Sequence, residues 1–478
     1  MNLADRLRQA LGPGVVFEGA ENAIVYEYDY GLDRGMPELV VLPRSTADVQ
    51  VIVREAQAAQ VPIVPRGAGT GISGGAVPNS GGLVVGLSRM NRILEIDAAN
   101  RCAVVQPGAI NLDLSRAAEP YGLFFAPDPS SQKASTIGGN VANNAGGPHC
   151  LSLGVTVNHV LGVVMVLHDG SLVCLGGKSA DGPGLDLTGL IVGSEGTLGI
   201  VTEVTVRLLP LPEAVRTTLA VFASVEAASE AVSELIGHGL VPSALEMMDR
   251  LALSAIEAAF HAGYPPEAGA VLLVEVDGLL EQVEAQAMVV DAVCRAAGAL
   301  EIRLAATADE RARLWAARKG AASAMGRIAP NYYLHDAVVP RTQLPRILAH
   351  VVEIGQRYDL PIANLFHAGD GNLHPMILFD SREVGILDRV MAAGREILTQ
   401  CIEAGGTITG EHGVGLEKQA FMPLIFSPAD LEVMARVRHA IDPSGNFNPN
   451  KVLPVPDAAH GMAHRSAMPG LVPEGMWV

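Results

Sequence analysis

The sequence has few cysteines. Among 478 residues there are five, at positions Cys102, Cys150, Cys174, Cys294 and Cys401. They are odd in number, scattered along the chain and never in C-x-x-C spacing. This pattern excludes both a disulfide framework and an iron–sulfur cluster held by this chain. We expect the protein to work in a reducing compartment.

Basic residues are also scarce. The chain has 33 Lys and Arg against 51 Asp and Glu, which gives a formal net charge of −18, and no basic patch is visible. Nucleic acids and anionic membrane surfaces are bound by basic patches, so neither is an expected partner. The same charge would repel an anionic substrate. A site for an acid therefore needs local positive charge from an arginine or a metal ion.

Long hydrophobic runs are missing as well. No uncharged apolar stretch reaches the length of about eighteen residues that suggests a transmembrane helix, so we expect no membrane span. The first residues, MNLADRLRQALG, predict a short amphipathic helix and lack the apolar centre of a signal peptide. The expected location is the cytoplasm.

The remaining composition predicts a large globular enzyme of the α+β class. Hydrophobic residues make up 49% of the chain, and the length favours two or three domains. Residues 1–211 are expected to form one α+β domain. In residues 212–427, strand-then-helix units predict an antiparallel sheet with helices packed on one face. Residues 428–455 are expected to form a separate C-terminal segment and residues 456–478 an exposed tail.

A glycine-rich stretch, VPRGAGTGISGGAVP at residues 64–78, contains the pattern G-x-G-x-x-G. A dinucleotide-binding turn with this pattern needs a helix directly after its third glycine, and the Gly and Pro residues that follow prevent one. The Rossmann interpretation is therefore rejected. The backbone could still present several N–H groups to an anion, helped by Thr70, Ser73 and Arg66. A flexible surface loop is the alternative.

Two further segments are rich in glycine and small polar residues. They are PDPSSQKASTIGGNVANNAGG at residues 127–147 and VGSEGTLGIVTEV at residues 192–204. Their amide and hydroxyl groups suit a polyphosphate, a ribityl chain or a ring edge better than a hydrophobic core. Three such segments in one domain favour a cofactor site over a flexible loop.

The second domain contains FHAGDGNLHP and TITGEHGVG. His367 and His374 are seven residues apart across a glycine-rich turn, a spacing that suits a hairpin bringing both imidazoles to one point. Glu411 and His412 can join them. Two histidines and a carboxylate are common ligands of a catalytic divalent ion. Each histidine taken alone would more often be structural.

With these segments the chain resembles the FAD-linked oxidases of the vanillyl-alcohol oxidase and p-cresol methylhydroxylase superfamily, over nearly its whole length. Within this superfamily it is similar to the catalytic flavin subunits of bacterial glycolate oxidases, a group related to D-lactate and D-2-hydroxyglutarate dehydrogenases. The resemblance implies two domains, an FAD-binding domain of the p-cresol methylhydroxylase type and a substrate (cap) domain.

The resemblance also implies the FAD-binding residues. The first glycine segment would wrap the pyrophosphate, the second would run along the flavin, and residues of the third would reach the adenosine end. Asn448 of NFNPNK would approach the isoalloxazine, so that residues 428–455 return to the flavin. The implied residues are Arg66, Gly67, Ala68, Gly69, Thr70, Gly71, Ser73, Gly74, Pro127, Asp128, Ser131, Ser135, Gly138, Asn140, Asn143, Gly147, Glu195, Ile200 and Asn448.

Some relatives attach FAD covalently through a histidine or a cysteine. His149 and Cys150 lie in a suggestive place, but a buried structural histidine is the preferred interpretation. We expect non-covalent FAD.

By the same resemblance, His367, His374 and Glu411 would hold a divalent metal, Zn²⁺ first with Mn²⁺ or Fe²⁺ as alternatives, and His412 would be the base. Arg318 of RLWAARKG would clamp the substrate carboxylate with two hydrogen bonds. From the residues alone Arg318 could equally be a solvated helix charge. The 2-hydroxyglutarate enzymes hold a second carboxylate where this chain has Ala322 and Leu334, which favours a small monocarboxylate.

The expected activity is oxidation of a small 2-hydroxy acid, glycolate to glyoxylate, by hydride transfer to FAD N5. The resemblance implies that electrons pass to a second FAD-domain subunit and an iron–sulfur subunit rather than to O₂, and that these subunits could hold the chain at the inner face of the membrane. The nearest alternative is an FAD-linked D-lactate dehydrogenase, because one methyl group gives little discrimination. A metal-dependent hydrolase and a non-catalytic flavin subunit are the alternatives from other classes.

Overall fold

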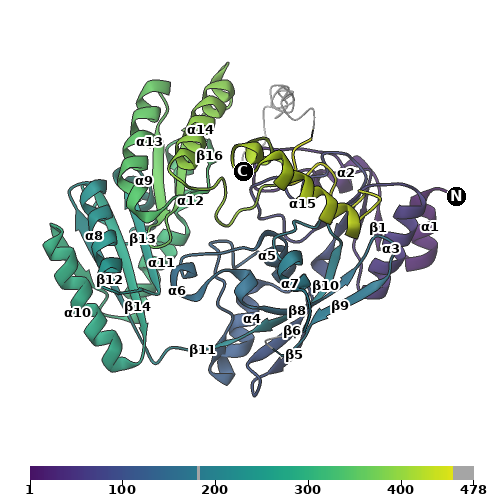
Figure 1. The fold of residues 1–478 in the computed structure, drawn as a ribbon, viewed down its shortest axis with the longest axis horizontal. Helices are drawn as coiled ribbons and strands as arrows, with labels where there is room; N and C mark the ends of the chain where they lie inside the picture. Colours follow the sequence, from purple (N-terminus) through teal and green to yellow (C-terminus); the bar gives the residue numbers. More distant parts are fainter. Residues whose placement is uncertain (180–182, 456–478) are drawn as a thin grey trace.

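The computed structural model describes residues 1–179 and 183–455, and the expected tail at 456–478 lies outside these ranges. Two bodies lie side by side (Figure 1). One is formed by the first part of the chain, drawn in purple and blue, and the other by the middle part, drawn in teal and green. The strands of the two bodies belong to separate sheets.

The first body contains two sheets. In the first sheet three strands run parallel and β1 is antiparallel to its neighbour; its order is β1 (Val16–Phe17), β2 (Leu39–Val41), β4 (Leu83–Gly86), β3 (Ile63–Arg66). The second is antiparallel, in the order β5 (Ile93–Asp97), β6 (Cys102–Val105), β10 (Ile200–Arg207), β8 (Val160–Val166), β9 (Leu172–Gly176). The helices of the first body include α1 (Leu3–Leu11), α4 (Asn111–Ala118), α5 (Ile137–Asn143) and α7 (Leu187–Ile191).

Helix α3 (Thr46–Ala58) and strand β3 precede the glycine residues of the first glycine segment. The Ser45 side chain accepts a hydrogen bond from the N–H of Asp48, which caps the helix. The buried face of α3 carries Val49, Ile52, Val53 and Ala56. Strand β3 follows, and residues 67–82 after it contain no helix, as the rejection of a Rossmann turn requires.

The second body is built on one antiparallel sheet, as predicted. A short pair of β7 (Leu123–Phe124) with β11 (Leu209–Pro210) precedes it. The strand order is β15 (Glu301–Leu304), β12 (Ala214–Phe222), β14 (Ala270–Gly278), β13 (Ala244–Asp249), β18 (Ile362–His367), β19 (Asn372–Phe379), β16 (Asn331–Leu334), and β17 (Ala337–Val338) also pairs with β19.

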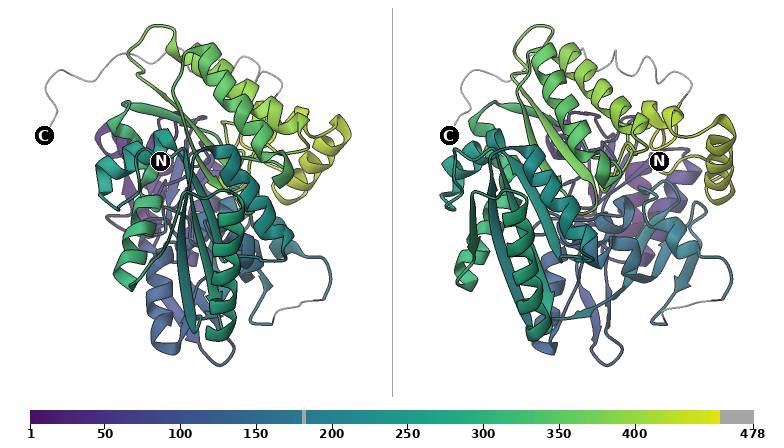
Figure 2. Two further views of the ribbon diagram at one scale, coloured as in Figure 1. Left: turned by 90° about the vertical axis from the view of Figure 1, so that its left-hand side faces the viewer. Right: turned by 60° about the vertical axis from the view of Figure 1, so that its left-hand side comes forward.

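Helices cover both faces of this sheet, so the expectation of helices on one face was wrong. The outer face carries α8 (Val225–Gly237), α10 (Leu280–Ala296), α13 (Leu344–Tyr358) and α14 (Ile386–Glu403), which Figures 1 and 2 show packed along the strands. The face toward the first body carries α9 (Arg250–Phe260), α11 (Ala308–Lys319) and α12 (Ala321–Ala324). Neighbours Leu272 and Leu273 of β14 are both buried, on opposite faces. The continuous apolar run AVLLV at residues 270–274 is the sequence signal of such a strand.

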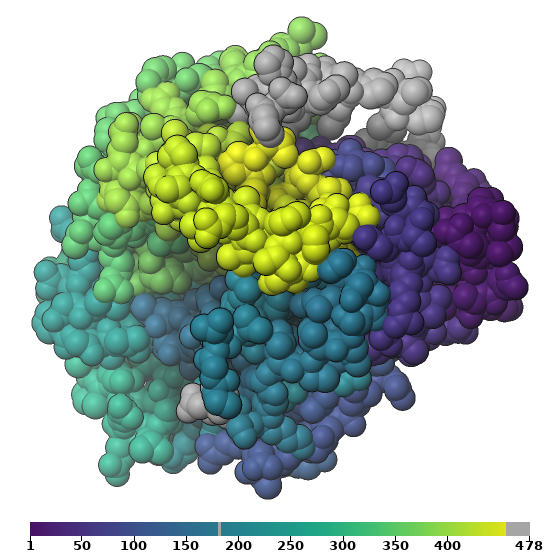
Figure 3. Space-filling view, turned by 45° about the vertical axis from the view of Figure 1, so that its right-hand side comes forward, coloured from purple at the N-terminus to yellow at the C-terminus, as the bar shows by residue number. Residues whose placement is uncertain are grey.

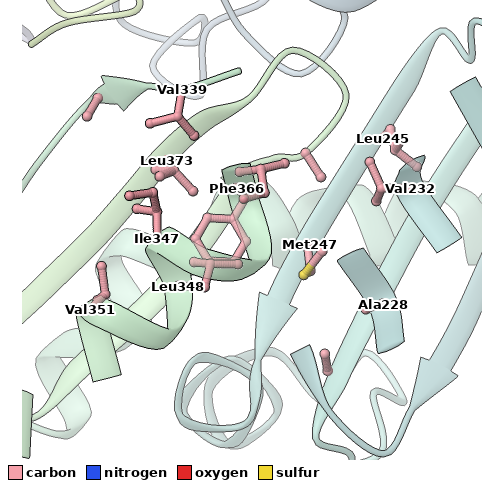
Figure 4. Close-up of a cluster of buried hydrophobic side chains, with 14 of the residues drawn as sticks. Ala228, Val232, Leu245, Met247, Val339, Ile347, Leu348, Val351, Phe366 and Leu373 are labelled. Carbon is pink, nitrogen blue, oxygen red and sulfur yellow. The ribbon is translucent and has the colours of Figure 1, made fainter. Parts of the chain in front are cut away.

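The larger hydrophobic core fills the outer face. In Figure 4 Phe366 of β18 points toward Ile347 and Leu348 of α13, and all three are buried. No helix in the described part of the chain has both the length and the apolar character needed to cross a bilayer.

The last described segment returns to the first body. After α15 (Pro428–Ile441), the N–H of Ile63 donates to the Asn446 carbonyl and the N–H of Asn448 donates to the Ile63 carbonyl. The fully buried Lys451 donates from Nζ to the carbonyls of Gly75 and Val77. Figure 3 shows this segment in yellow, between the green second body and the purple and blue first body.

A buried ionic network joins the two bodies. Glu275 of β14 accepts hydrogen bonds from Arg311 (2.6 and 2.8 Å) and from Trp315 Nε1 (2.6 Å). His149 of the first body lies 3.3 Å from Glu275 and 2.9 Å from Asp128. Burial alone would raise the pKa of Glu275, but the hydrogen bonds from Arg311 and His149 lower it to about 2.

Removal of this charge should destabilise the protein. We expect Glu275→Gln to lower the free energy of unfolding at pH 7 by about 3 kcal/mol, because Arg311 and His149 lose a buried counter-charge. Folding lowers the pKa of Glu275, so its stabilisation is present above the unfolded value of about 4.5 and is lost as the pH falls toward 2. Guanidinium unfolding at several pH values measures this. The matched control Glu284→Gln, in a half-exposed pair with Arg216, should cost less than about 1 kcal/mol; equal effects would contradict the prediction.

Candidate active site

One cavity of about 470 Å³ lies between the two bodies. The first body contributes residues of all three glycine-rich segments to its wall. The second body contributes residues from the end of α11 and the segment after it, from β16, β18 and β19, and from the loop at 411–412: Arg318, Lys319, Ala322, Ser323, Tyr332, Leu334, Leu365, His367, His374, Met376, Glu411 and His412. The cavity therefore brings the predicted cofactor segments and the predicted histidine cluster to one place.

The first glycine segment has the properties of an anion cradle. None of the backbone N–H groups of residues 68–73 donates to an acceptor within the described ranges. A side chain at Gly71 would meet no atom within 4 Å, so the backbone borders open space there. Gly69 has φ +73°, and a Cβ on it would collide with the guanidinium of Arg66. Unpaired N–H groups beside a buried arginine fit the diphosphate of FAD.

The cavity wall contains most of the residues expected to bind FAD. They are Arg66, Gly67, Ala68, Gly69, Thr70, Gly71, Ser73, Ser131, Ser135, Gly138, Asn140, Asn143 and Glu195. Two buried atoms among them, Ser135 Oγ and Asn140 Nδ2, have no hydrogen-bond partner in the described protein. Such atoms also fit a polar ligand, because unsatisfied buried donors and acceptors are costly.

Six expected residues do not line the cavity: Gly74, Pro127, Asp128, Gly147, Ile200 and Asn448. Ile200 is 1% exposed within a hydrophobic core. Asp128 is paired with His149 and with Lys319 Nζ at 2.7 Å. Asn448 donates from Nδ2 to the carbonyls of Gly75 and Glu195, so its side chain supports the glycine segments from behind.

The histidine cluster forms where β18 ends and β19 begins. His367 Nε2 lies 3.1 Å and His374 Nε2 3.5 Å from Glu411 Oε1. The imidazole rings of His367 and His374 are 5.0 Å apart. One ligand atom from each of these three residues can lie within 4.8 Å of the others, which fits a divalent ion.

Glu246 of β13 connects this cluster to Arg318. Its Oε1 lies 2.7 Å from His367 Nδ1, and its Oε2 lies 2.5 Å from Arg318 Nη2. A carboxylate on the second nitrogen of a ligand histidine fixes the tautomer and the ring direction. Arg318 is 4% exposed, and its Nε has no acceptor in the described protein. A buried donor at the cavity wall fits a bound carboxylate.

Asp336 organises the segment that carries Glu411 and His412. It is fully buried and accepts hydrogen bonds from Thr409 Oγ1 (2.6 Å) and from the N–H groups of Gly410 (2.9 Å) and His412 (2.9 Å). Asp336, His374 and His412 are a second group of suitable spacing for a metal. Asp336 Oδ2 already accepts several hydrogen bonds, whereas Asp336 Oδ1 lies 3.3 Å from His374 Nε2.

His412 lies beside the group of His367, His374 and Glu411 and belongs to the group of Asp336, His374 and His412. Its ring is stacked on His374 at 5.0 Å, and its Nε2 is 3.8 Å from Glu411 Oε1. Burial lowers the pKa of His412 to about 4, against the opposing charge of Asp336. His412 Nδ1 has no hydrogen-bond partner in the described protein. A neutral imidazole at the cavity wall can accept a proton.

Sequence reasoning missed Glu246 and Asp336. Glu246 lies between apolar residues in ALEMM, and Asp336 precedes the apolar residues of LHDAVV. The signal that could have found them was a charge within a buried strand for Glu246 and next to a short strand for Asp336, because a buried charge must be paired. His149 has a carboxylate at each ring nitrogen, which agrees with the preferred structural interpretation.

The chain is similar to known proteins over nearly its whole length. The family models described as "FAD binding domain" and "FAD linked oxidases, C-terminal domain" match residues 37–176 and 211–452. The chain is 47% identical to glycolate oxidase subunit GlcD of Escherichia coli K12, with 92% of this chain and 89% of that one covered. It is 43% identical to GlcD of Bacillus subtilis (94% and 96%) and 33% identical to a D-lactate dehydrogenase of Anaerostipes hadrus (88% and 90%).

Solved structures show the same fold at low identity. The structure of p-cresol methylhydroxylase with substrate bound has a TM-score of 0.80 at 17% identity and covers 94% of this chain and 96% of that one. A 4-ethylphenol oxidase from Gulosibacter chungangensis has a TM-score of 0.77 at 20% identity (95% and 96%). The resemblance found in the sequence is thus confirmed, and the chain belongs to the FAD-linked oxidases, with an FAD-binding domain followed by their C-terminal domain.

Proposed function

We propose that this protein oxidises a small 2-hydroxy acid to the 2-oxo acid with non-covalent FAD, and that glycolate is its substrate. The single observation that carries this is the shared cavity, where the glycine segments meet Arg318 and the His367 cluster. The relatives named glycolate oxidase subunits support glycolate. D-lactate is the second candidate, supported by the relative named D-lactate dehydrogenase.

The chain's own residues have separate roles in this reaction. Arg318 binds the substrate carboxylate and so places the hydroxyl group toward the histidine cluster. His412 accepts the hydroxyl proton at a ring nitrogen. When bound, FAD supplies a two-electron acceptor for the C2 hydride, and a divalent ion on His367, His374 and Glu411 supplies charge stabilisation at the hydroxyl oxygen. Zn²⁺ is the first candidate, with Mn²⁺ or Fe²⁺ as alternatives.

The wall near Arg318 supports a small monocarboxylate. Ala322, Leu334, Leu365 and Met376 line the cavity there. The neighbouring cation, Lys319, is paired with Asp128. A second carboxylate on the substrate would therefore be desolvated without a free counter-charge.

Electrons from the reduced flavin are proposed to pass to partner subunits. The five cysteines are free and dispersed, so an iron–sulfur centre would have to come from another chain. The word "subunit" in the names of the GlcD relatives supports such an assembly. We propose a second FAD-domain subunit and an iron–sulfur subunit, which could hold the complex at the inner face of the membrane.

The cofactor site is tested by Gly69→Val. The purified wild type should contain about one FAD that acid or heat releases, because no covalent bond holds it. The branched side chain would enter a left-handed position against Arg66, so the variant should lose FAD while remaining folded. Flavin absorbance of the released supernatant and circular dichroism measure this. Full FAD occupancy in the variant would place the pyrophosphate elsewhere.

The roles of Glu411 and His412 are separated by two substitutions. Glu411→Gln removes a ligand charge, so the variant should bind metal weakly and regain part of its activity in excess metal. His412→Asn should keep FAD and metal but slow flavin reduction by roughly 10²–10⁴-fold, without rescue by metal. Elemental analysis and stopped-flow absorbance provide the two measurements. Loss of metal from His412→Asn, or normal flavin reduction by it, would remove His412 as the base.

The substrate class is tested by steady-state assays with an artificial dye acceptor. Glycolate and D-lactate should be oxidised, and D-2-hydroxyglutarate should have a kcat/KM lower by roughly a hundredfold or more, because its second carboxylate meets an apolar wall. L-lactate serves as the stereochemical control. A preference for D-2-hydroxyglutarate over both small acids would refute the monocarboxylate site.

A further inference from the structure

Glu195 lies in the wall of the cofactor cavity, and its carboxylate contacts the second body. Glu195 is 5% exposed and has φ +53° in the third glycine-rich segment. Its backbone N–H donates to the Ala142 carbonyl and its own carbonyl accepts from Asn448 Nδ2, so the main chain is fixed within the first body. Its carboxylate reaches the segment that follows His412.

Both oxygens of this carboxylate bind backbone N–H groups of the second body. Oε1 accepts from Val414 at 2.7 Å and Oε2 accepts from Gly415 at 2.9 Å. A Cβ on Gly413 would lie 2.7 Å from Glu195 Oε1, so glycine at 413 leaves room for the carboxylate. A carboxylate suits this position because both of its oxygens only accept hydrogen bonds.

The same segment is held from its other end by Asp336. Asp336 accepts from the N–H groups of Gly410 and His412. Between these two carboxylates, the His412 carbonyl accepts from Ser73 Oγ at 3.1 Å and from Asn143 Nδ2 at 2.8 Å. The bend that aims Glu411 and His412 at the cavity is thus supported by one carboxylate from each body.

We propose that Glu195 is a positioning residue, which sets the direction of Glu411 and His412 from the opposite domain through the N–H groups of Val414 and Gly415. The expected effect on catalysis rests on the proposed function, whereas the hydrogen bonds of Glu195 are observed in the structure. Misplacement of a reacting group by about 1 Å can cost roughly 10²-fold in rate. The segment is short and rich in glycine, so loss of one support should be enough to move it.

The experiment compares Glu195→Gln with the control Glu203→Gln in the FAD-loaded protein. The amide of glutamine has one oxygen, which can accept, and one NH₂ group, which can only donate. The NH₂ group would face a backbone N–H group of Val414 or Gly415, so one of the two hydrogen bonds is lost. Glu203 is a half-buried carboxylate on β10 that does not line the cavity. We expect Glu195→Gln to keep FAD, to bind metal more weakly and to reduce flavin roughly 10- to 100-fold more slowly at saturating substrate, with little change in KM. Glu203→Gln should match the wild type in all four.

Hydrogen exchange gives a readout independent of activity. In the wild type the amides of Val414 and Gly415 should exchange slowly, and in Glu195→Gln about tenfold faster, with peptides of β18 unchanged. Glu195→Asp, whose shorter carboxylate cannot reach both N–H groups, is the second variant if Glu195→Gln does not fold.

Several results would overturn the proposal. Loss of FAD from Glu195→Gln would make the carboxylate a cofactor ligand. Normal flavin reduction and metal binding in the variant, or fast exchange of both amides in the wild type, would deny it a positioning role. A wild type that oxidises no 2-hydroxy acid would instead refute the proposed function, and the exchange measurement would still decide whether Glu195 holds the segment.

Discussion

The fully buried carboxylate of Glu246 is the interaction on which the site depends. A charge without solvent is tolerated only when it is paired. Burial would raise the pKa of Glu246, but Arg318 and His367 lower it. These two partners come from α11 and β18, so one carboxylate fixes both the group proposed to hold the substrate acid and a group proposed to hold the metal. If either Arg318 or His367 moved away, part of the buried charge of Glu246 would lose its partner.

The site also requires both domains at once. The second domain supplies the chemistry-bearing side chains, while Ser73, Asn143 and Glu195 of the first domain hold the backbone between His412 and Gly415. The buried Glu275 network makes a second junction between the domains, at the interior strand β14 of the large sheet. Both junctions are made of charge-assisted hydrogen bonds. Such bonds fix the distance and the orientation between the two domains more strictly than apolar contacts do. The cavity between the domains can therefore be largely formed before any ligand enters it.

The sequence predicted what is encoded locally. The cap at Ser45, the helix-free glycine loop and the convergence of His367, His374 and Glu411 all follow from short patterns. The partners of Glu246 and Asp336 are distant in the sequence, so the sequence could show that a buried charge needs a partner but not which residue that partner is. Arg318 could be separated from Arg311 and Lys319 only by family resemblance. In the structure those two neighbours pair with Glu275 and Asp128. The helices on the second face of the large sheet were not predicted, because the sequence of a buried strand does not show which helices cover each of its faces.

The support that Lys451 gives to the glycine segment has a consequence for biosynthesis. Its ammonium group binds the carbonyls of Gly75 and Val77, across a separation of more than 370 residues. On the ribosome the first domain must therefore wait, with this face of its cofactor loop unsupported, until the whole second domain has been made. At typical rates of about 5–20 residues per second, this interval lasts tens of seconds. Cofactor loading would then follow the completion of translation, and a truncated chain would be a poor competitor for FAD.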